Sequence, residues 1–124
     1  MIRRRFIKSC AGLAATLASA SCVEFHSGPL AGAPKGATFA KLRGANIHFV
    51  DEGQGPVVVL IHGFASSMGA WAGIRKALAG KFRVIALDLK GFGWSDRPEG
   101  DYSPKAQAEI ILDLLDERGV DSPV

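Results

Sequence analysis

The chain has 124 residues, of which 48% are hydrophobic and 22% are charged, a composition typical of one small globular domain. Its formal net charge of +3 is uneven, because residues 1–22 contain four of the 15 basic residues and no acidic one. The other 11 basic and 12 acidic residues leave the rest of the chain at −1, so we expect no basic patch and no binding to nucleic acid.

Cysteine and histidine are too sparse for a metal centre or a disulfide framework. The two cysteines, Cys10 and Cys22, both belong to the N-terminal leader, and His26, His48 and His62 are far apart in the sequence. The sequence therefore predicts neither a metal ion nor another cofactor.

Residues 1–22 have the order of an export signal, with a positively charged start (Met1–Lys8) and then a small, mildly apolar segment (Cys10–Ala20). This segment is shorter than the roughly 20 apolar residues of a membrane-spanning helix. Arg3–Lys8, with the sequence RRRFIK, resembles the twin-arginine export motif. We therefore expect the protein in the periplasm, anchored to a membrane or secreted by a bacterium.

The sequence leaves open how this leader is processed. Ala18-Ser19-Ala20 fits the small-x-small pattern of ordinary cleavage, whereas Cys22 could be the lipidated first residue of a membrane-tethered lipoprotein. In a third interpretation Cys22 has no such role. Residues 23–37 are rich in glycine, proline and alanine, which predicts a flexible linker to a domain at residues 38–124.

The domain begins with a predicted β-hairpin at Phe39–Val50 that turns at Arg43–Asn46. Side chains alternate between the two faces of a strand. We therefore expect Ile47 and Phe49 to face the core and His48 to face solvent.

Two uninterrupted apolar runs, Val57–Ile61 and Val84–Leu87, are typical of strands buried on both faces of a parallel sheet. Between them, apolar side chains recur at helical spacing and a glycine follows, which predicts a helix (Trp71, Ile74, Leu78, Gly80). The order of strand, helix and strand predicts a βαβ unit.

A second helix is predicted after the glycine-containing loop at Asp88–Gly100. Ser103 and Pro104 suit its N-cap and first position, and Gly119 suits its end. One face of this helix is apolar and should pack on the sheet (Ile110, Ile111, Leu114, Leu115).

The segments after the two apolar strands resemble two motifs of the α/β-hydrolase fold family. His62-Gly63-Phe64-Ala65 is similar to the His-Gly turn of that family, and Asp88–Asp96 (DLKGFGWSD) is similar to its Asp-x-x-Gly-x-Gly-x-Ser loop. The resemblance covers residues 38–124. It implies an α/β fold in which this chain forms the N-terminal part of the hydrolase sheet, a β-hairpin followed by βαβα.

The resemblance also implies part of an active site. In the family, the backbone N–H that follows His-Gly is one donor of the oxyanion hole, which here is the N–H of Phe64, supported by His62 and Gly63. Phe64 and Phe92 are expected to border the substrate pocket, and Asp88 is expected to hold its loop in place. The expected partner is a small-molecule substrate.

No residue of the sequence has the setting of a catalytic nucleophile. Ser95 lacks the second glycine of Gly-x-Ser-x-Gly and lies in the wrong loop, and Ser66 and Ser67 suit helix caps better. Pro123-Val124 looks like the opening of the strand that precedes the family's nucleophile. The sequence thus indicates a truncated domain whose triad lies beyond Val124, and which by itself is inactive towards p-nitrophenyl esters and poorly folded.

The sequence leaves three hypotheses for the function. The first is the N-terminal part of an exported hydrolase that acts on small esters or related bonds through a Ser-His-Asp mechanism. Ala65 replaces the proline of the His-Gly-x-Pro turn seen in epoxide- and halide-cleaving relatives, which disfavours those two activities. The second hypothesis is a non-catalytic exported or membrane-tethered binding protein on the same scaffold. The third, a dinucleotide-binding oxidoreductase, is disfavoured because Gly-x-Gly-x-x-Gly is absent.

Overall fold

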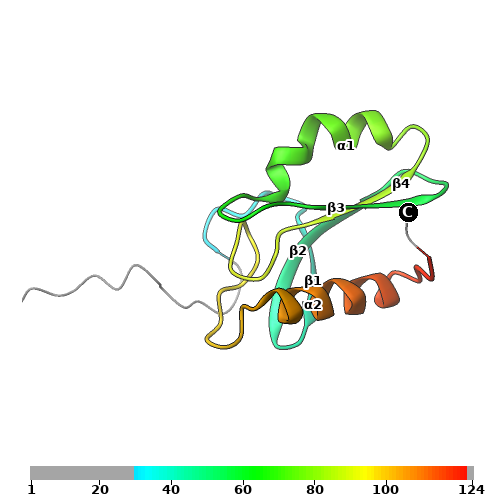
Figure 1. The fold of residues 1–124 in the computed structure, drawn as a ribbon. Coiled ribbons are helices and arrows are strands. Elements are labelled where there is room, and N and C mark those ends of the chain that lie inside the picture. The colour runs from blue at the N-terminus through cyan, green and yellow to red at the C-terminus, as the bar shows by residue number, and fades with distance from the viewer. Residues whose placement is uncertain (1–29, 123–124) are drawn as a thin grey trace, which may run out of the picture.

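A computed structural model describes residues 30–122 of the chain (Figure 1). In chain order the elements are β1, β2, β3, a short 3-10 helix η1, α1, β4 and α2 (Thr38–Leu42, Ala45–Glu52, Val57–Ile61, Met68–Trp71, Ala72–Leu78, Arg83–Leu87, Pro104–Glu117). The predicted leader with Cys22 lies outside the described residues, as do the start of the linker and Pro123-Val124. Within residues 30–122, no helix has the length and apolar character needed to cross a membrane.

The strands form one mixed sheet in the order β1-β2-β4-β3. β1 and β2 pair as an antiparallel hairpin, β2 pairs antiparallel with β4, and β4 pairs parallel with β3. The hairpin turn has positive φ at both central residues, Arg43 (46°) and Gly44 (81°), as a type I′ turn requires. The predicted order of a β-hairpin followed by βαβα is confirmed.

α2 covers one face of the sheet and forms the main hydrophobic core with it (Figure 1). Ile47 and Phe49 of β2 and Leu87 of β4 are buried together with Ile110 and Leu114 of α2. The alternate residues of β2 that the sequence predicts to be buried therefore pack against the apolar face of α2.

Polar contacts hold both ends of α2. At its start, the Ser103 hydroxyl oxygen accepts the N–H of Ala106 at 3.2 Å, which is the predicted N-cap. Just after its end, Arg118 donates to the Asp51 carboxylate of β2 at 3.1 Å, and Arg83 of β4 donates to the same group at 2.7 Å. The hydrogen bond from Arg83 is the main reason why the pKa of Asp51 lies below its ordinary value.

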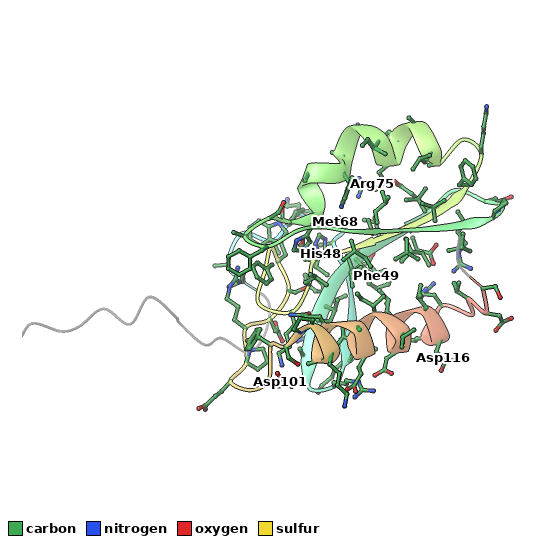
Figure 2. The ribbon with its side chains drawn as sticks, in the orientation of Figure 1. His48, Phe49, Met68, Arg75, Asp101 and Asp116 are labelled. Carbon is green, nitrogen blue, oxygen red and sulfur yellow. The ribbon has the colours of Figure 1, made fainter. Side chains whose placement is uncertain are left out.

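α1 covers the opposite face of the sheet, and its inward side differs from the simplest helical pattern (Figure 2). Ile74, which helical spacing groups with Trp71 and Leu78, is 51% exposed. Arg75 lies on the inward side instead, where its Nε is 2.8 Å from Oε1 of Glu52 on β2. An ion pair therefore lies between α1 and the sheet, whereas Ile74, one of the three apolar positions of the predicted pattern, is exposed.

β3 is less buried than its apolar sequence predicts. Its residues are half-buried and Ile61 is 46% exposed, whereas Val84–Leu87 of β4 are buried. β4 has a neighbouring strand on each side, but within the described residues β3 pairs only with β4. The prediction of a strand buried on both faces is confirmed for β4 and wrong for β3.

Two leucines of α2 test how much the core contributes to stability. Leu114 is fully buried, whereas Leu112 on the same helix is 64% exposed. We expect Leu114→Ala to lower the free energy of unfolding by about 2–5 kcal/mol, because the deletion leaves a cavity. Leu112→Ala, the matched control, should change it by less than about 0.5 kcal/mol. Urea denaturation of both variants measures the difference, and equal losses would contradict this packing.

Candidate active site

The two motif loops meet at the carboxyl ends of β3 and β4. These strands are parallel neighbours, with Ile61 opposite Leu87, so the residues that follow each strand come close together. The N–H of Leu89 donates to Nε2 of His62 at 3.0 Å, which joins the loops directly. The ring of Phe92 also packs edge-on against the ring of His62, with 5.6 Å between the centroids. The parallel pairing therefore builds one site from segments that are about 25 residues apart.

His62 is buried, and both of its ring nitrogens are occupied. Nδ1 lies 2.8 Å from the carbonyl oxygen of Gly63, which can only accept, so Nδ1 carries the hydrogen. Nε2 accepts the N–H of Leu89 and is therefore unprotonated. These two bonds require the neutral ring with its hydrogen on Nδ1, and they leave no nitrogen free to act as a base. In this geometry His62 orders the loop.

The His-Gly motif leads into a tight turn at Gly63–Ser66. The turn is closed by a hydrogen bond from the Ser66 N–H to the Gly63 carbonyl oxygen at 3.3 Å. Its second residue is Phe64, whose N–H donates to no other described residue and whose side chain is 93% exposed. Its third residue is Ala65, with φ of +55°. Positive φ at the third position is the mark of a type II turn.

The left-handed residue of this turn is not the one that the sequence suggests. Glycine is the usual residue at positive φ, and Gly63 is the glycine of the His-Gly motif. Gly63 does not have positive φ, and a Cβ atom added there would meet nothing within 4 Å. Ala65 adopts the left-handed conformation instead.

Asp88 connects three segments around the site. Its side chain is buried, and Oδ1 accepts the N–H of Met68 at the start of η1 at 2.7 Å. Oδ2 accepts the N–H of Trp94 at 2.9 Å and lies 2.8 Å from Nδ1 of His48. Burial acts to raise the pKa of Asp88, but the hydrogen bonds from His48, Trp94 and Met68 outweigh it and place the pKa below its ordinary value. Asp88 thus holds the loop, as the resemblance implies, and also the start of η1.

His48 is buried, which contradicts its predicted exposure to solvent (Figure 2). The alternation along β2 is correct, because His48 faces away from the core around α2. The α1 side of the sheet, however, is covered and offers the carboxylate of Asp88 as a partner. A buried polar ring is stable there because its hydrogen bond replaces the lost contact with water.

The described serines do not form a nucleophile site. Ser95 is fully buried, and its hydroxyl accepts the backbone N–H of His48 and donates to the backbone oxygen of Asp88. Ser67 occupies the N-cap position of η1, but its side chain makes no capping bond, so the predicted cap is wrong in that detail. Among residues 30–122, no serine hydroxyl is hydrogen-bonded to a histidine ring nitrogen.

The aromatic residues expected at the pocket mouth contact each other. The rings of Phe64 and Phe92 pack edge to face, with 5.9 Å between centroids. The described residues also line a partly open cavity of about 250 Å³, to which neither ring contributes. It lies between β2, η1 and the loop after β4, with His48, Arg75 and Trp94 in its wall. No group of three or more possible metal ligands occurs within residues 30–122. That Phe64 and Phe92 border a substrate pocket stays a prediction.

A second polar contact holds the loop after β4, and the sequence motif does not reveal it. The side-chain amide of Gln107 on α2 bonds to both backbone groups of Lys90: the Lys90 N–H donates to Oε1 at 3.1 Å, and Nε2 donates to the Lys90 oxygen at 2.8 Å. Gln107 is buried among the apolar residues of the helix. In the sequence, the signal for this contact was one polar residue, Gln107, on an otherwise apolar face of the predicted helix.

Comparison with known proteins supports the resemblance. The family model described as the alpha/beta hydrolase fold matches residues 56–124. The chain is 35% identical over 82 residues to a soluble epoxide hydrolase of Corynebacterium sp., covering 66% of this chain and 29% of that protein. It is 41% identical over 76 residues to haloalkane dehalogenase 2 of Mycobacterium tuberculosis, covering 60% and 27%. An α/β-hydrolase fold protein from Burkholderia ambifaria has a similar structure, with a TM-score of 0.67, 35% identity, and coverage of 79% and 35%.

The family match covers more than half of the chain, and the fold and both loops agree with it. The chain therefore belongs to the α/β-hydrolase fold family, and its relatives include hydrolases. The chain spans about a quarter of the length of the curated relatives that it matches.

Gly93 tests how closely the loop is packed around Asp88. A Cβ atom at Gly93 would lie 2.2 Å from the Asp88 carboxyl carbon, and its φ is +50°. Gly44 has φ of +81° but nothing within 4 Å of such an atom, so it is the matched control for backbone strain alone. We expect Gly44→Ala to cost about 1–2 kcal/mol of stability. Gly93→Ala should cost about 1–3 kcal/mol more, because the methyl group displaces the carboxylate. Equal losses in chemical denaturation would contradict this contact.

The low pKa of Asp88 predicts a stability loss in acid. A folded-state pKa below the unfolded value of about 3.9 means that the stabilisation is fully present above that pH and is lost as pH falls through the folded-state pKa. We expect Asp88→Asn to weaken stability at pH 7 by about 1–3 kcal/mol and to remove this part of the acid decline. Asp116→Asn, at an exposed site, should keep both the stability of the parent at pH 7 and its decline in acid. Thermal unfolding from about pH 6 to pH 2 measures the effect. An unchanged acid decline in the Asp88 variant would contradict the assignment.

Proposed function

We propose that this chain provides the oxyanion side of a hydrolase active site that acts on small esters or related bonds. The observation that carries the proposal is the N–H of Phe64, which donates to no residue within 30–122 and is presented on a tight turn directly after a parallel strand. A donor held in this way needs no rearrangement when negative charge develops on a substrate oxygen, so it stabilises the transition state more than the substrate.

The chemistry proposed for the turn is common to several bond types. Attack on an ester carbonyl places negative charge on its oxygen, and ring opening of an epoxide places it on the departing oxygen. One backbone N–H serves either oxyanion. The related epoxide hydrolase brings epoxides into the proposed range. The related haloalkane dehalogenase adds carbon–halogen bonds, where the negative charge develops on the departing halide and not on an oxygen. Ala65, in place of proline, favours the ester within that range.

The remaining catalytic groups are proposed to lie outside residues 30–122. The described part of the chain pairs no serine hydroxyl with a histidine ring nitrogen, and both nitrogens of His62 are occupied. A Ser-His-Asp mechanism therefore requires a nucleophile and a base from elsewhere in the full-length gene product. The proposed activity belongs to that product as a whole.

Phe64→Pro tests the donor without changing the turn. Proline lacks the N–H, yet its φ of about −65° suits the second position of a type II turn. We expect kcat of the full-length gene product for p-nitrophenyl esters to fall by about 10²–10³-fold, with a smaller change in KM. Phe64→Leu, which keeps the N–H and loses the ring, is the control and should retain most of kcat.

Two results would contradict the proposal. One is a full-length protein that hydrolyses none of the tested substrates, which should include p-nitrophenyl esters, epoxides and haloalkanes. The other is a Phe64→Pro variant that folds, as circular dichroism would show, and keeps the kcat of Phe64→Leu.

A further inference from the structure

The turn at Gly63–Ser66 differs from three similar turns in the same structure. In all four turns a backbone N–H donates to the carbonyl oxygen three residues earlier, and the third residue of the turn has positive φ. The three other turns have glycine at that third position (Gly32, φ +89°; Gly36, φ +80°; Gly91, φ +90°). Only the turn that carries the Phe64 N–H has a residue with a side chain there, Ala65 at φ +55°.

Within residues 30–122, nothing around Ala65 explains this choice as packing. The residue is exposed, so its methyl group fills no part of the core. The left-handed region is unfavourable for residues with a Cβ atom, and glycine would adopt it without strain. A strained backbone persists only where the surrounding structure imposes it.

The surrounding structure does impose it, because the two residues that directly follow β4, Asp88 and Leu89, hold the segment on both sides. Before the turn, His62 accepts the N–H of Leu89 and donates to the carbonyl oxygen of Gly63. After the turn, the N–H of Met68 donates to Asp88. Asp88 and Leu89 are adjacent residues at the end of β4, so both ends of the turn are fixed to one place. The turn cannot relieve its strain by moving as a unit.

We propose that Ala65 is a positioning residue that narrows the range of directions of the Phe64 N–H. The left-handed region open to a residue with a Cβ atom is small, whereas glycine has a much wider range of φ and ψ. With both ends held, alanine leaves the turn a single narrow conformation and therefore a single direction for the donor. This inference rests on the function proposed above, because it concerns the same donor.

The test compares Ala65→Gly with the parent in the full-length gene product. Ala65→Gly should relieve strain and raise Tm by a few degrees, yet lower kcat for a p-nitrophenyl ester by about 3–10-fold without changing KM, because only the transition-state contact weakens. A purely structural role would move Tm and kcat in the same direction.

Ala31→Gly is the matched control. Ala31 is an exposed residue of the Leu30–Ala33 turn and lies outside the proposed site, so this variant makes the same change in another turn. Its kcat and KM should equal those of the parent. The strong intraresidue amide–Hα NOE expected of a left-handed residue would verify the conformation of Ala65 in solution.

The outcomes separate this inference from the proposed function. If Phe64→Pro loses activity but Ala65→Gly keeps the parent kcat, the positioning role of Ala65 is wrong and the oxyanion donor stands. A weak amide–Hα NOE at Ala65 would also overturn the positioning role. If the parent protein hydrolyses none of the substrates, the proposed function fails and the role of Ala65 fails with it.

Discussion

The carboxylate of Asp88 is the group on which both loops of the site depend. A buried carboxylate is stable only if donors replace its water, and here three donors come from three segments of the chain: His48 of β2, Met68 of η1 and Trp94 of the following loop. The same residue also joins β2 through its backbone, because its N–H donates to the carbonyl oxygen of His48. One side chain therefore sets the positions of the strand, the helix start and the loop relative to one another.

The turn at Gly63–Ser66, which we propose carries the oxyanion donor, gains most from this arrangement. The parallel register places Ile61 beside Leu87, so the chain leaves β3 next to the end of β4. His62 then attaches the start of the turn to Leu89, and the bond from Met68 attaches the following segment to Asp88. A donor for a developing negative charge must be in place before the reaction, and these contacts hold the Phe64 N–H without using it.

Several features were predictable because local patterns dominate them. The apolar face of α2, its Ser103 cap and the hairpin at Arg43 and Gly44 follow from spacing and turn chemistry. Other features depended on partners that are distant in sequence. His48 looked exposed because its neighbours in sequence face the core, but Asp88 lies opposite it. Helical spacing grouped Ile74 with Trp71 and Leu78, yet Ile74 is exposed. Arg75 lies on the side of α1 that faces the sheet, beside Glu52.

The sequence by itself determined the family, the order of the elements and the two loops of the site, because hydrophobic periodicity and glycine-containing motifs are local properties of the chain. The tertiary structure alone decided how those loops are held. The hydrogen bonds of Asp88 with its three donors connect residues that no local pattern relates. The same is true of the two hydrogen bonds between the Gln107 side chain and the Lys90 backbone. The same holds for the His-Gly motif. His62-Gly63-Phe64 can be recognised in the sequence, but the left-handed residue of its turn is Ala65, and contacts with Asp88 and Leu89 hold both ends of the segment.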